Sequence, residues 1–140
     1  MPKVKRIDHI AILVDDLDET LGFWQEALGL ELGGALNVPE EQSMIAFLPA
    51  GESQVELVKP TSEDSGLARY LKKRGPGMHH ICLEVDDIEG MIAQLKQNGI
   101  QMINEEPKTG AGGRRYAFIH PKSAHGVMVE LYELPLEVNA

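Results

Sequence analysis

The chain contains an internal repeat, which restricts the folds open to it more than any other feature of its sequence. Residues 7–17 (IDHIAILVDDL) align without a gap with residues 78–88 (MHHICLEVDDI), 71 positions later, and five of the eleven aligned residues are identical. The same offset relates residues 46–48 to residues 117–119, and VEL at 55–57 recurs at 129–131, three positions further on. Matches in the same order in both halves predict two tandem modules of about 60 residues.

Each module is expected to begin with a strand and a helix and to continue with three short strands. Asp16 and Asp87 stand where helix N-caps are favoured, and Gly29 and Gly99 stand where helices end in a left-handed residue. The expected strands are 7–14, 30–37, 43–48, 53–58, 78–85, 100–104, 114–119 and 126–133. This βαβββ order, read twice, predicts α+β architecture in which the two modules form one curved mixed sheet.

The length of 140 residues fits one domain, which we expect to span residues 4–137. Within it, the modules are expected at about 5–60 and 77–135, and a short helix at about 63–74 should link them. Gly75-Pro76 should end that helix, since this dipeptide is typical of a boundary between elements.

Charge and composition exclude several classes of partner. Thirteen basic residues against 22 acidic ones give a net charge of −9, which disfavours binding to nucleic acid or anionic membranes. The longest apolar run, residues 10–14, is far shorter than the roughly 20 residues of a membrane-spanning helix. The single cysteine, Cys82, suits a reducing compartment. The sequence therefore predicts a cytoplasmic protein that binds neither nucleic acid nor membrane.

Two histidines and two glutamates occupy equivalent positions of the repeat. His9 and His80 lie in the first strands of the modules, and Glu56 and Glu130 lie in the last. Each of them alone is more simply explained as a solvated or hydrogen-bonded side chain. The repeat changes this interpretation, because equivalent positions converge if the modules pair about a pseudo-twofold axis. Two imidazoles and two carboxylates there predict a site for a divalent transition metal.

A local group of basic residues surrounds the glycine-rich segment 109–113. Arg114 and Arg115 follow that segment, and Lys108 and Lys122 are nearby in sequence. In an acidic protein such a cluster could hold the phosphates of an anionic ligand, with Lys108, Arg115 and Lys122 as candidate substrate-binding residues. Solvated charges without a ligand explain the cluster equally well.

Four segments of the chain resemble those of a known enzyme family. They are IDHIA at 7–11, GMHHICLEV at 77–85, EPKTG at 106–110, and the turn HPKS at 120–123 followed by GVMVEL at 126–131. Over about residues 5–135 the sequence resembles the vicinal oxygen chelate superfamily and, within it, the methylmalonyl-CoA epimerase family. The HPKS turn is the most family-specific of these segments.

The resemblance implies a sheet funnel with a central metal held by His9, Glu56, His80 and Glu130. It implies an isomerase that epimerises methylmalonyl-CoA at C2 by proton abstraction and reprotonation through a metal-stabilised enolate. The implied cofactor is one divalent ion of the Co, Mn, Ni or Zn type, with no organic cofactor. The implied partners are an acyl-CoA substrate and a second copy of the chain in a homodimer.

Epimerisation needs a proton acceptor on one face of C2 and a donor on the other. Some members of the family carry a proposed catalytic Glu on the strand before Ala46-Phe47, where alignment gives Met44 in this chain. Either a ligand glutamate acts as the base, with Glu130 and Glu56 as the catalytic candidates, or Glu41 reaches in from the preceding loop.

Two other functions fit parts of the pattern. Glyoxalase I (lactoylglutathione lyase) uses the same metal set, but the HPKS turn and the segment 106–108 favour the epimerase. A metal-free small-molecule-binding module of the same fold would have broken ligand positions, whereas all four are intact here.

Overall fold

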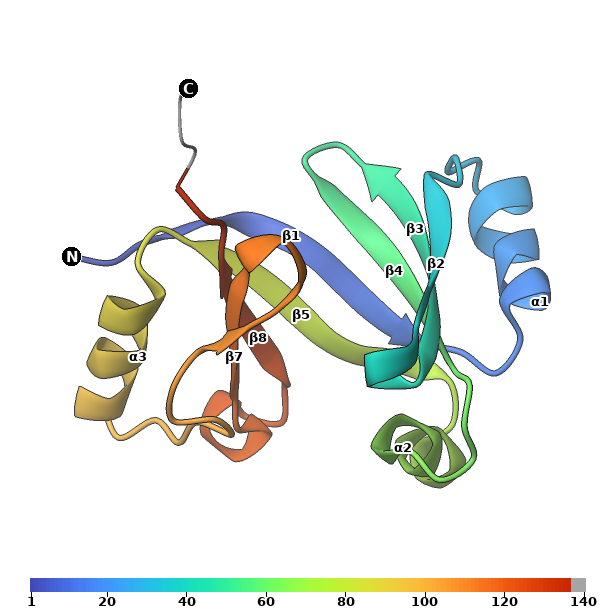
Figure 1. Ribbon diagram of the computed structural model, residues 1–140. Coiled ribbons are helices and arrows are strands. Elements are labelled where there is room, and N and C mark those ends of the chain that lie inside the picture. The colour runs from blue at the N-terminus through green and yellow to red at the C-terminus, as the bar shows by residue number, and fades with distance from the viewer. Residues whose placement is uncertain (137–140) are drawn as a thin grey trace. The chain divides into compact units, whose positions relative to one another are not determined.

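The computed structural model describes residues 1–136, with eight strands and three α-helices (Figure 1). The strands are β1 (Val4–Leu13), β2 (Gly34–Val38), β3 (Ser43–Ala50), β4 (Ser53–Pro60), β5 (Gly77–Val85), β6 (Lys108–Thr109), β7 (Arg115–Ile119) and β8 (Val129–Glu133). The helices are α1 (Leu17–Leu21), which continues as a π-helix over Gly22–Ala27, α2 (Gly66–Arg74) and α3 (Ile88–Gln97). Short 3₁₀ turns occupy Pro39–Glu41, Ala111–Gly113 and Pro121–Ala124.

The chain forms two compact units whose boundaries fall within β1 and β5. The first unit comprises His9–His79, and its strands follow the order β2-β3-β4-β1. The second unit comprises Met1–Asp8 and the chain from residue 80 onward, and its strands follow the order β5-β8-β7-β6. The start of the chain belongs to this second sheet, because the Asp86 N–H donates to the Lys3 carbonyl oxygen at 3.2 Å.

The pairing of strands repeats in the two units as the sequence does. The parallel pair β1–β4 sets Ala11 beside Glu56, and the parallel pair β5–β8 sets Cys82 beside Glu130. The antiparallel pairs β3–β4 and β7–β8 match in the same way, since each sets a phenylalanine beside that glutamate. The predicted βαβββ repeat and the α+β fold class are therefore confirmed.

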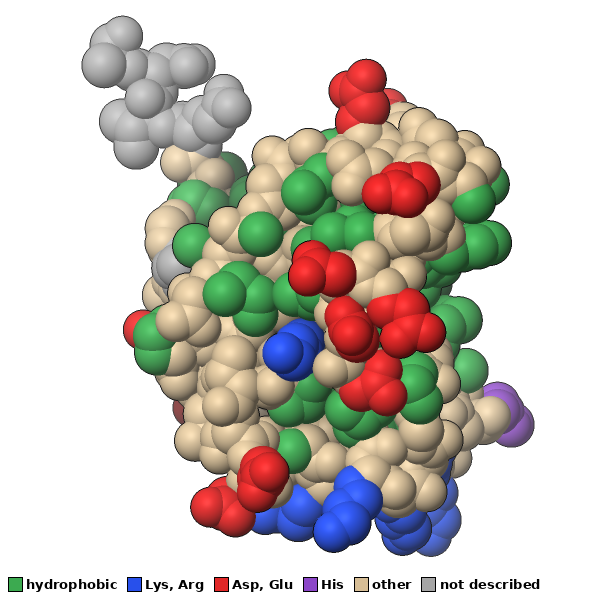
Figure 2. Space-filling view, turned by 90° about the vertical axis from the view of Figure 1, so that its right-hand side faces the viewer, with side chains coloured by type: hydrophobic (Ala, Val, Ile, Leu, Met, Phe, Trp, Pro, Cys, Tyr) green, Lys and Arg blue, Asp and Glu red, His purple; other side chains and the backbone are tan. Residues whose placement is uncertain are grey.

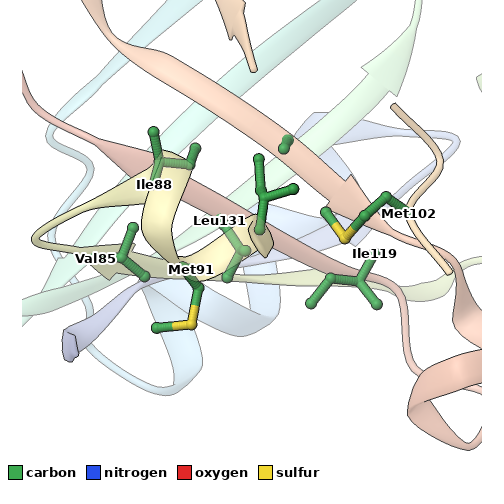
Figure 3. Close-up of a cluster of buried hydrophobic side chains, with 8 residues drawn as sticks. Val85, Ile88, Met91, Met102, Ile119 and Leu131 are labelled. Atoms are coloured by element: carbon green, nitrogen blue, oxygen red, sulfur yellow. The ribbon is translucent and has the colours of Figure 1, made fainter. Parts of the chain in front are cut away.

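In each unit a helix covers one face of the sheet with apolar side chains. Leu17, Leu21 and Trp24, from α1 and its π-helical continuation, pack on Val14, Ala46, Leu48 and Leu57. In the second unit α3 contributes Ile88, Met91 and Ile92 to a cluster with Val85, Met102, Ala117, Ile119 and Leu131 (Figure 3). Burial of each large side chain stabilises the fold by about 1.5–3 kcal/mol. These clusters hold α1 and α3 each on one face of its sheet.

Asp16 and Asp87 cap the two helices as predicted. Each carboxylate accepts the backbone N–H three residues on, at 3.1 Å in α1 and 3.0 Å in α3. Gly29 and Gly99 have φ angles of 90° and 76°, in the left-handed region that an L side chain disfavours.

The linking helix α2 begins later than predicted and ends where expected. Its first residue is Gly66 rather than a residue near 63, because the Ser65 hydroxyl caps it by accepting the Ala68 N–H at 3.0 Å. It ends at Arg74, and the residue after it, Gly75, has a φ angle of 79°.

Two predicted strands of the second module were wrong in extent. Residues 100–104 form no strand, and Met102 makes an isolated bridge instead, while β6 lies at Lys108–Thr109. The final strand β8 begins three residues later than the predicted position 126. The cause is the turn Pro121–Ala124, after which His125 has a left-handed φ angle of 55°.

The face opposite α1 is itself partly covered in the first unit. Leu67, Tyr70 and Leu71 of α2 pack there on Ala11, Leu13, Ile45 and Val58.

Acidic and basic side chains are unevenly distributed on the surface of the first unit. Figure 2 shows acidic side chains gathered on the side of α1, whose first turn contains Asp18 and Glu19. Lys and Arg side chains gather at the lower edge of that view, where α2 ends in Lys72, Lys73 and Arg74. No helix in the described part of the chain is both long enough and apolar enough to cross a membrane.

Candidate active site

On the sheet face opposite the α1 or α3 helix, each unit carries a histidine and a glutamate from neighbouring parallel strands. Glu56 lies beside Ala11, and His9 is two residues earlier in β1 on the same face. In the second unit Glu130 lies beside Cys82, and His80 is two residues before Cys82 in β5 on the same face. The structure thus brings together His9 with Glu56, and His80 with Glu130.

The first pair is almost completely buried. His9 Nδ1 lies 3.1 Å from Glu56 Oε2, and the side chains are 6% and 10% exposed. The Gln54 amide donates a further hydrogen bond to Glu56 Oε2 at 3.1 Å. A buried carboxylate needs such partners, because burial without them costs several kcal/mol.

The second pair has a similar N···O distance but is formed through the other imidazole nitrogen. His80 Nε2 lies 3.0 Å from Glu130 Oε1, and the side chains are 13% and 14% exposed. The Phe118 ring meets the His80 ring edge-on, with ring centres 5.7 Å apart. Phe118 is also the strand partner of Glu130 across β7 and β8, so its ring lies beside the His80–Glu130 pair.

The spacing within each pair suits metal binding. A divalent ion of the zinc type binds imidazole nitrogen and carboxylate oxygen at about 2.0–2.2 Å, so two neighbouring ligand atoms lie about 3–3.5 Å apart, depending on the angle between them. The N···O distances of 3.1 and 3.0 Å lie at the lower end of that range. Imidazole with carboxylate is also a donor set that Mn, Co, Ni and Zn accept. Each pair, taken by itself, therefore fits two neighbouring ligands of a divalent ion.

Beyond Glu130 on the same face, the second unit holds a network of polar side chains. The Tyr132 hydroxyl donates to Asp8 Oδ1 at 2.7 Å, and the Arg6 guanidinium donates to the same oxygen at 2.9 Å. Arg6 Nε also donates to Glu84 Oε1 at 2.8 Å. Burial, followed by the hydrogen bond to Asp8, raises the pKa of Tyr132, so this hydroxyl stays protonated.

Sequence reasoning missed this network, although the repeat contains a signal for it. Glu84 and Tyr132 stand where the first module has Leu13 and Val58, which are apolar and lie beneath α2. A charged residue that replaces a core residue in one copy of a repeat indicates that its surroundings have changed.

The three basic residues expected to bind substrate lie in different surroundings. Lys108 pairs with Tyr116 across the β6–β7 hairpin and is exposed. Arg115 forms ion pairs with Glu89 Oε1 at 2.7 Å and Glu133 Oε2 at 3.7 Å, on the α3 side of the sheet. Lys122 is exposed on the turn Pro121–Ala124.

Met44 lies on the face of β3 that α1 covers. Met44 lies two residues before Ala46, which packs in the α1 cluster, so the two share a face, whereas Ile45 belongs to the cluster on the Glu56 face. The β3 residue nearest to the position of a base on that face is therefore Ile45, and an aliphatic side chain transfers no proton. Glu41 ends the turn Pro39–Glu41 and is exposed.

Comparison with known proteins places the chain in a family. The sequence model of the Glyoxalase/Bleomycin resistance protein/Dioxygenase superfamily matches residues 8–118. The mitochondrial methylmalonyl-CoA epimerase of Bos taurus is 39% identical over 127 residues, which cover 90% of this chain and 73% of that protein.

Solved structures agree with the sequence relatives. The methylmalonyl-CoA epimerase of Mycobacterium tuberculosis matches with a TM-score of 0.83 and 33% identity, over 95% of this chain and 90% of that one. A methylmalonyl-CoA epimerase in complex with methylmalonyl-CoA and NH4+ matches with a TM-score of 0.82 and 34% identity, over 94% of this chain and 96% of that one. The chain belongs to the Glyoxalase/Bleomycin resistance protein/Dioxygenase superfamily and, within it, to the enzymes of the methylmalonyl-CoA epimerase family.

Proposed function

We propose that this protein epimerises methylmalonyl-CoA at C2 by removing the C2 proton on one face and returning a proton on the other. The observation that carries the proposal is the presence of two mostly buried histidine–glutamate pairs with similar N···O distances, at equivalent positions of the repeat, in a chain of this family. A solved relative that holds methylmalonyl-CoA supports the acyl-CoA substrate.

We propose further that one divalent ion takes His9, Glu56, His80 and Glu130 as its ligands. The repeat and the matching N···O distances support this ligand set. When bound, such an ion supplies Lewis-acid stabilisation of negative charge on the thioester and carboxylate oxygens of the substrate.

Glu130 and Glu56 are the carboxylates we propose for proton transfer. The C2 proton is weakly acidic, so the base must be held close to it and away from bulk water. Both glutamates are mostly buried, and each is held by a histidine within 3.1 Å. Ile45 leaves β3 of the first unit without a carboxylate on the Glu56 face, which makes the ligand glutamates the simplest acid and base.

Deuterium exchange tests the reaction directly. The protein is stripped with chelator, reloaded with Co²⁺ or Mn²⁺ and incubated with methylmalonyl-CoA in D₂O, and deuterium at C2 is followed by mass spectrometry. We expect metal-dependent exchange. Absence of exchange with every metal would refute the epimerase proposal, and turnover of the glutathione–methylglyoxal adduct instead would identify glyoxalase I.

Variants test the residues. Glu130→Gln and Glu56→Gln should each lower the exchange rate by about 10²–10⁴-fold, the usual contribution of a general acid or base. His80→Ala should abolish stoichiometric metal binding, measured by elemental analysis of the purified protein. His125→Asn alters an exposed histidine outside both pairs and is the control. Full metal content in His80→Ala would contradict the ligand set.

A further inference from the structure

The β6–β7 hairpin presents two cations on the same sheet face as the His80–Glu130 pair. Phe118 pairs with Glu130, and Tyr116 pairs with Tyr132, so these aromatic residues share the face of the two β8 side chains. Lys108 pairs with Tyr116 and therefore lies on that face as well. Arg114 reaches it too, since its guanidinium carbon lies 4.9 Å from the centre of the Tyr132 ring.

The two cations are available for a ligand. Lys108 and Arg114 are exposed, and neither forms an ion pair with another residue among those the structure describes. Arg115 differs, because alternation turns it to the opposite face, where Glu89 and Glu133 neutralise it. Arg114 is also held in place, because the ring beneath it is fixed by the hydrogen bond from Tyr132 to Asp8.

A row of rings leads from the histidine–glutamate pair toward Lys108. The Phe118 ring centre is 5.7 Å from that of His80, and the Tyr116 ring centre is 6.2 Å from that of Phe118. Gly110 lies close to this row, since a side chain there would come within 3.3 Å of the Tyr116 ring. Two rings, those of Phe118 and Tyr116, therefore lie between the His80–Glu130 pair and Lys108 on this face.

We propose that Lys108 and Arg114 bind the phosphate groups of coenzyme A, and that Phe118 and Tyr116 line its pantetheine arm. The inference rests on the proposed function for the identity of the ligand. An acyl-CoA carries its reacting group and its phosphates at opposite ends of a long, largely uncharged arm. This order matches the sheet face, on which the His80–Glu130 pair is followed by the row of rings and then by the two cations. Guanidinium and ammonium groups are suited to phosphate, and here they concentrate positive charge locally in a protein of net charge −9.

Binding of free coenzyme A tests the inference without requiring catalysis. Isothermal titration calorimetry compares coenzyme A with pantetheine, which lacks the phosphates, for the wild type and the variant Lys108→Gln/Arg114→Gln. We expect the variant to bind coenzyme A about tenfold more weakly, corresponding to about 1.4 kcal/mol. Pantetheine affinity should stay within twofold, and the dependence of coenzyme A affinity on salt should become shallower in the variant.

A charge-matched variant and a neighbouring arginine sharpen the comparison. Lys72→Gln/Lys73→Gln removes two exposed cations from α2 and should leave coenzyme A affinity unchanged. Arg115→Gln should also leave coenzyme A affinity unchanged, because Arg115 lies on the opposite face of the sheet from Lys108 and Arg114. A larger loss in either of these variants than in Lys108→Gln/Arg114→Gln would overturn the inference.

The outcomes also separate this inference from the proposed reaction. Deuterium exchange by the wild type together with unchanged coenzyme A affinity in Lys108→Gln/Arg114→Gln would refute the phosphate site alone. Weakened coenzyme A binding in that variant without any exchange by the wild type would refute the reaction and retain the site. Equal losses for coenzyme A and pantetheine would show that the two cations act on the near end of the ligand, which also overturns the inference.

Discussion

Tyr132 and Glu84 show how two residues change the character of one sheet face. In the first unit the equivalent residues are Leu13 and Val58, which pack beneath α2. In the second unit the two polar side chains join a network in which each charge has a partner. Buried charges are tolerated only when they are paired, so the loss of one member of this network would leave another buried group without its partner.

Tyr132→Phe should lower the free energy of unfolding by about 1.5–3 kcal/mol at pH 8, the range for a hydrogen bond to a charged group. The loss should shrink as pH rises above 10. The folded protein raises the pKa of Tyr132, so the unfolded chain ionises this group first and the wild type loses stability there. Phenylalanine has no proton to lose at this position.

Urea unfolding of both proteins at pH 8 and pH 11 measures this difference. The other two tyrosines, Tyr70 and Tyr116, are present in both proteins and cancel in the comparison. A difference in unfolding free energy that stays constant between these pH values would contradict the raised pKa.

At the scale of elements, the cap of α3 depends on the absence of a side chain at Gly90. A Cβ added there would collide with the Asp87 carboxylate that caps the helix. Alanine in place of glycine stabilises a helix by about 1 kcal/mol, and an N-cap contributes a similar amount. The two effects should oppose each other at this position.

Gly90→Ala should therefore give no gain in the wild type and a gain of about 1 kcal/mol in the Asp87→Ala background, where there is no cap to displace. Urea unfolding of the four proteins of this double-mutant cycle is the measurement. In α1 the equivalent cap is formed by Asp16 beside Glu19, which has a side chain. If Asp87 can adopt that arrangement, Gly90→Ala would stabilise both backgrounds, contrary to expectation.

The elements that the sequence predicted well are those in which one local signal decides the structure. Asp16 and Asp87 cap helices because the carboxylate and the first-turn N–H groups are neighbours in sequence. The strand expected at 100–104 is absent because Lys108–Thr109 pairs with β7 instead. Which segment pairs at the edge of a sheet depends on tertiary contacts and not on local sequence alone. The turn Pro121–Ala124 likewise shortened β8.

The candidate site follows the same division. Strand alternation and the repeat were enough to predict which faces hold His9 with Glu56 and His80 with Glu130. Alternation also separates Arg114 from Arg115, but the sequence did not show where the alternation of β7 begins. The partners of Tyr132 come from residues 6 and 8, more than 120 positions away, and no local pattern links them.

At the scale of the whole molecule, the four proposed metal ligands are divided between the two units. Trp24 is the single tryptophan and lies in the first unit, whereas His80 lies in the second. An ion bound only by the folded protein at 100 times its dissociation constant stabilises it by about 2.7 kcal/mol. Fluorescence of Trp24 can therefore report whether a ligand from the second unit contributes to stabilisation of the first.

Mn²⁺ or Co²⁺ should raise the urea midpoint measured by Trp24 fluorescence, and His80→Ala should remove that increase. His125→Asn, which alters an exposed histidine of the second unit, should retain it. An increase that persists in His80→Ala would show that the ion is held within the first unit by His9 and Glu56.

The matched register of the two units identifies where this chain can change length without moving its site. Phe47 and its strand partner Glu56 are 9 positions apart, whereas Phe118 and its partner Glu130 are 12 positions apart, and this difference of three residues accounts for the shift in the repeat. Glu56 and Glu130 nevertheless keep the same neighbours across their strands. The connection from residue 120 to residue 128 can thus differ in length from its counterpart in the first unit while the strand pairing around Glu130 stays the same.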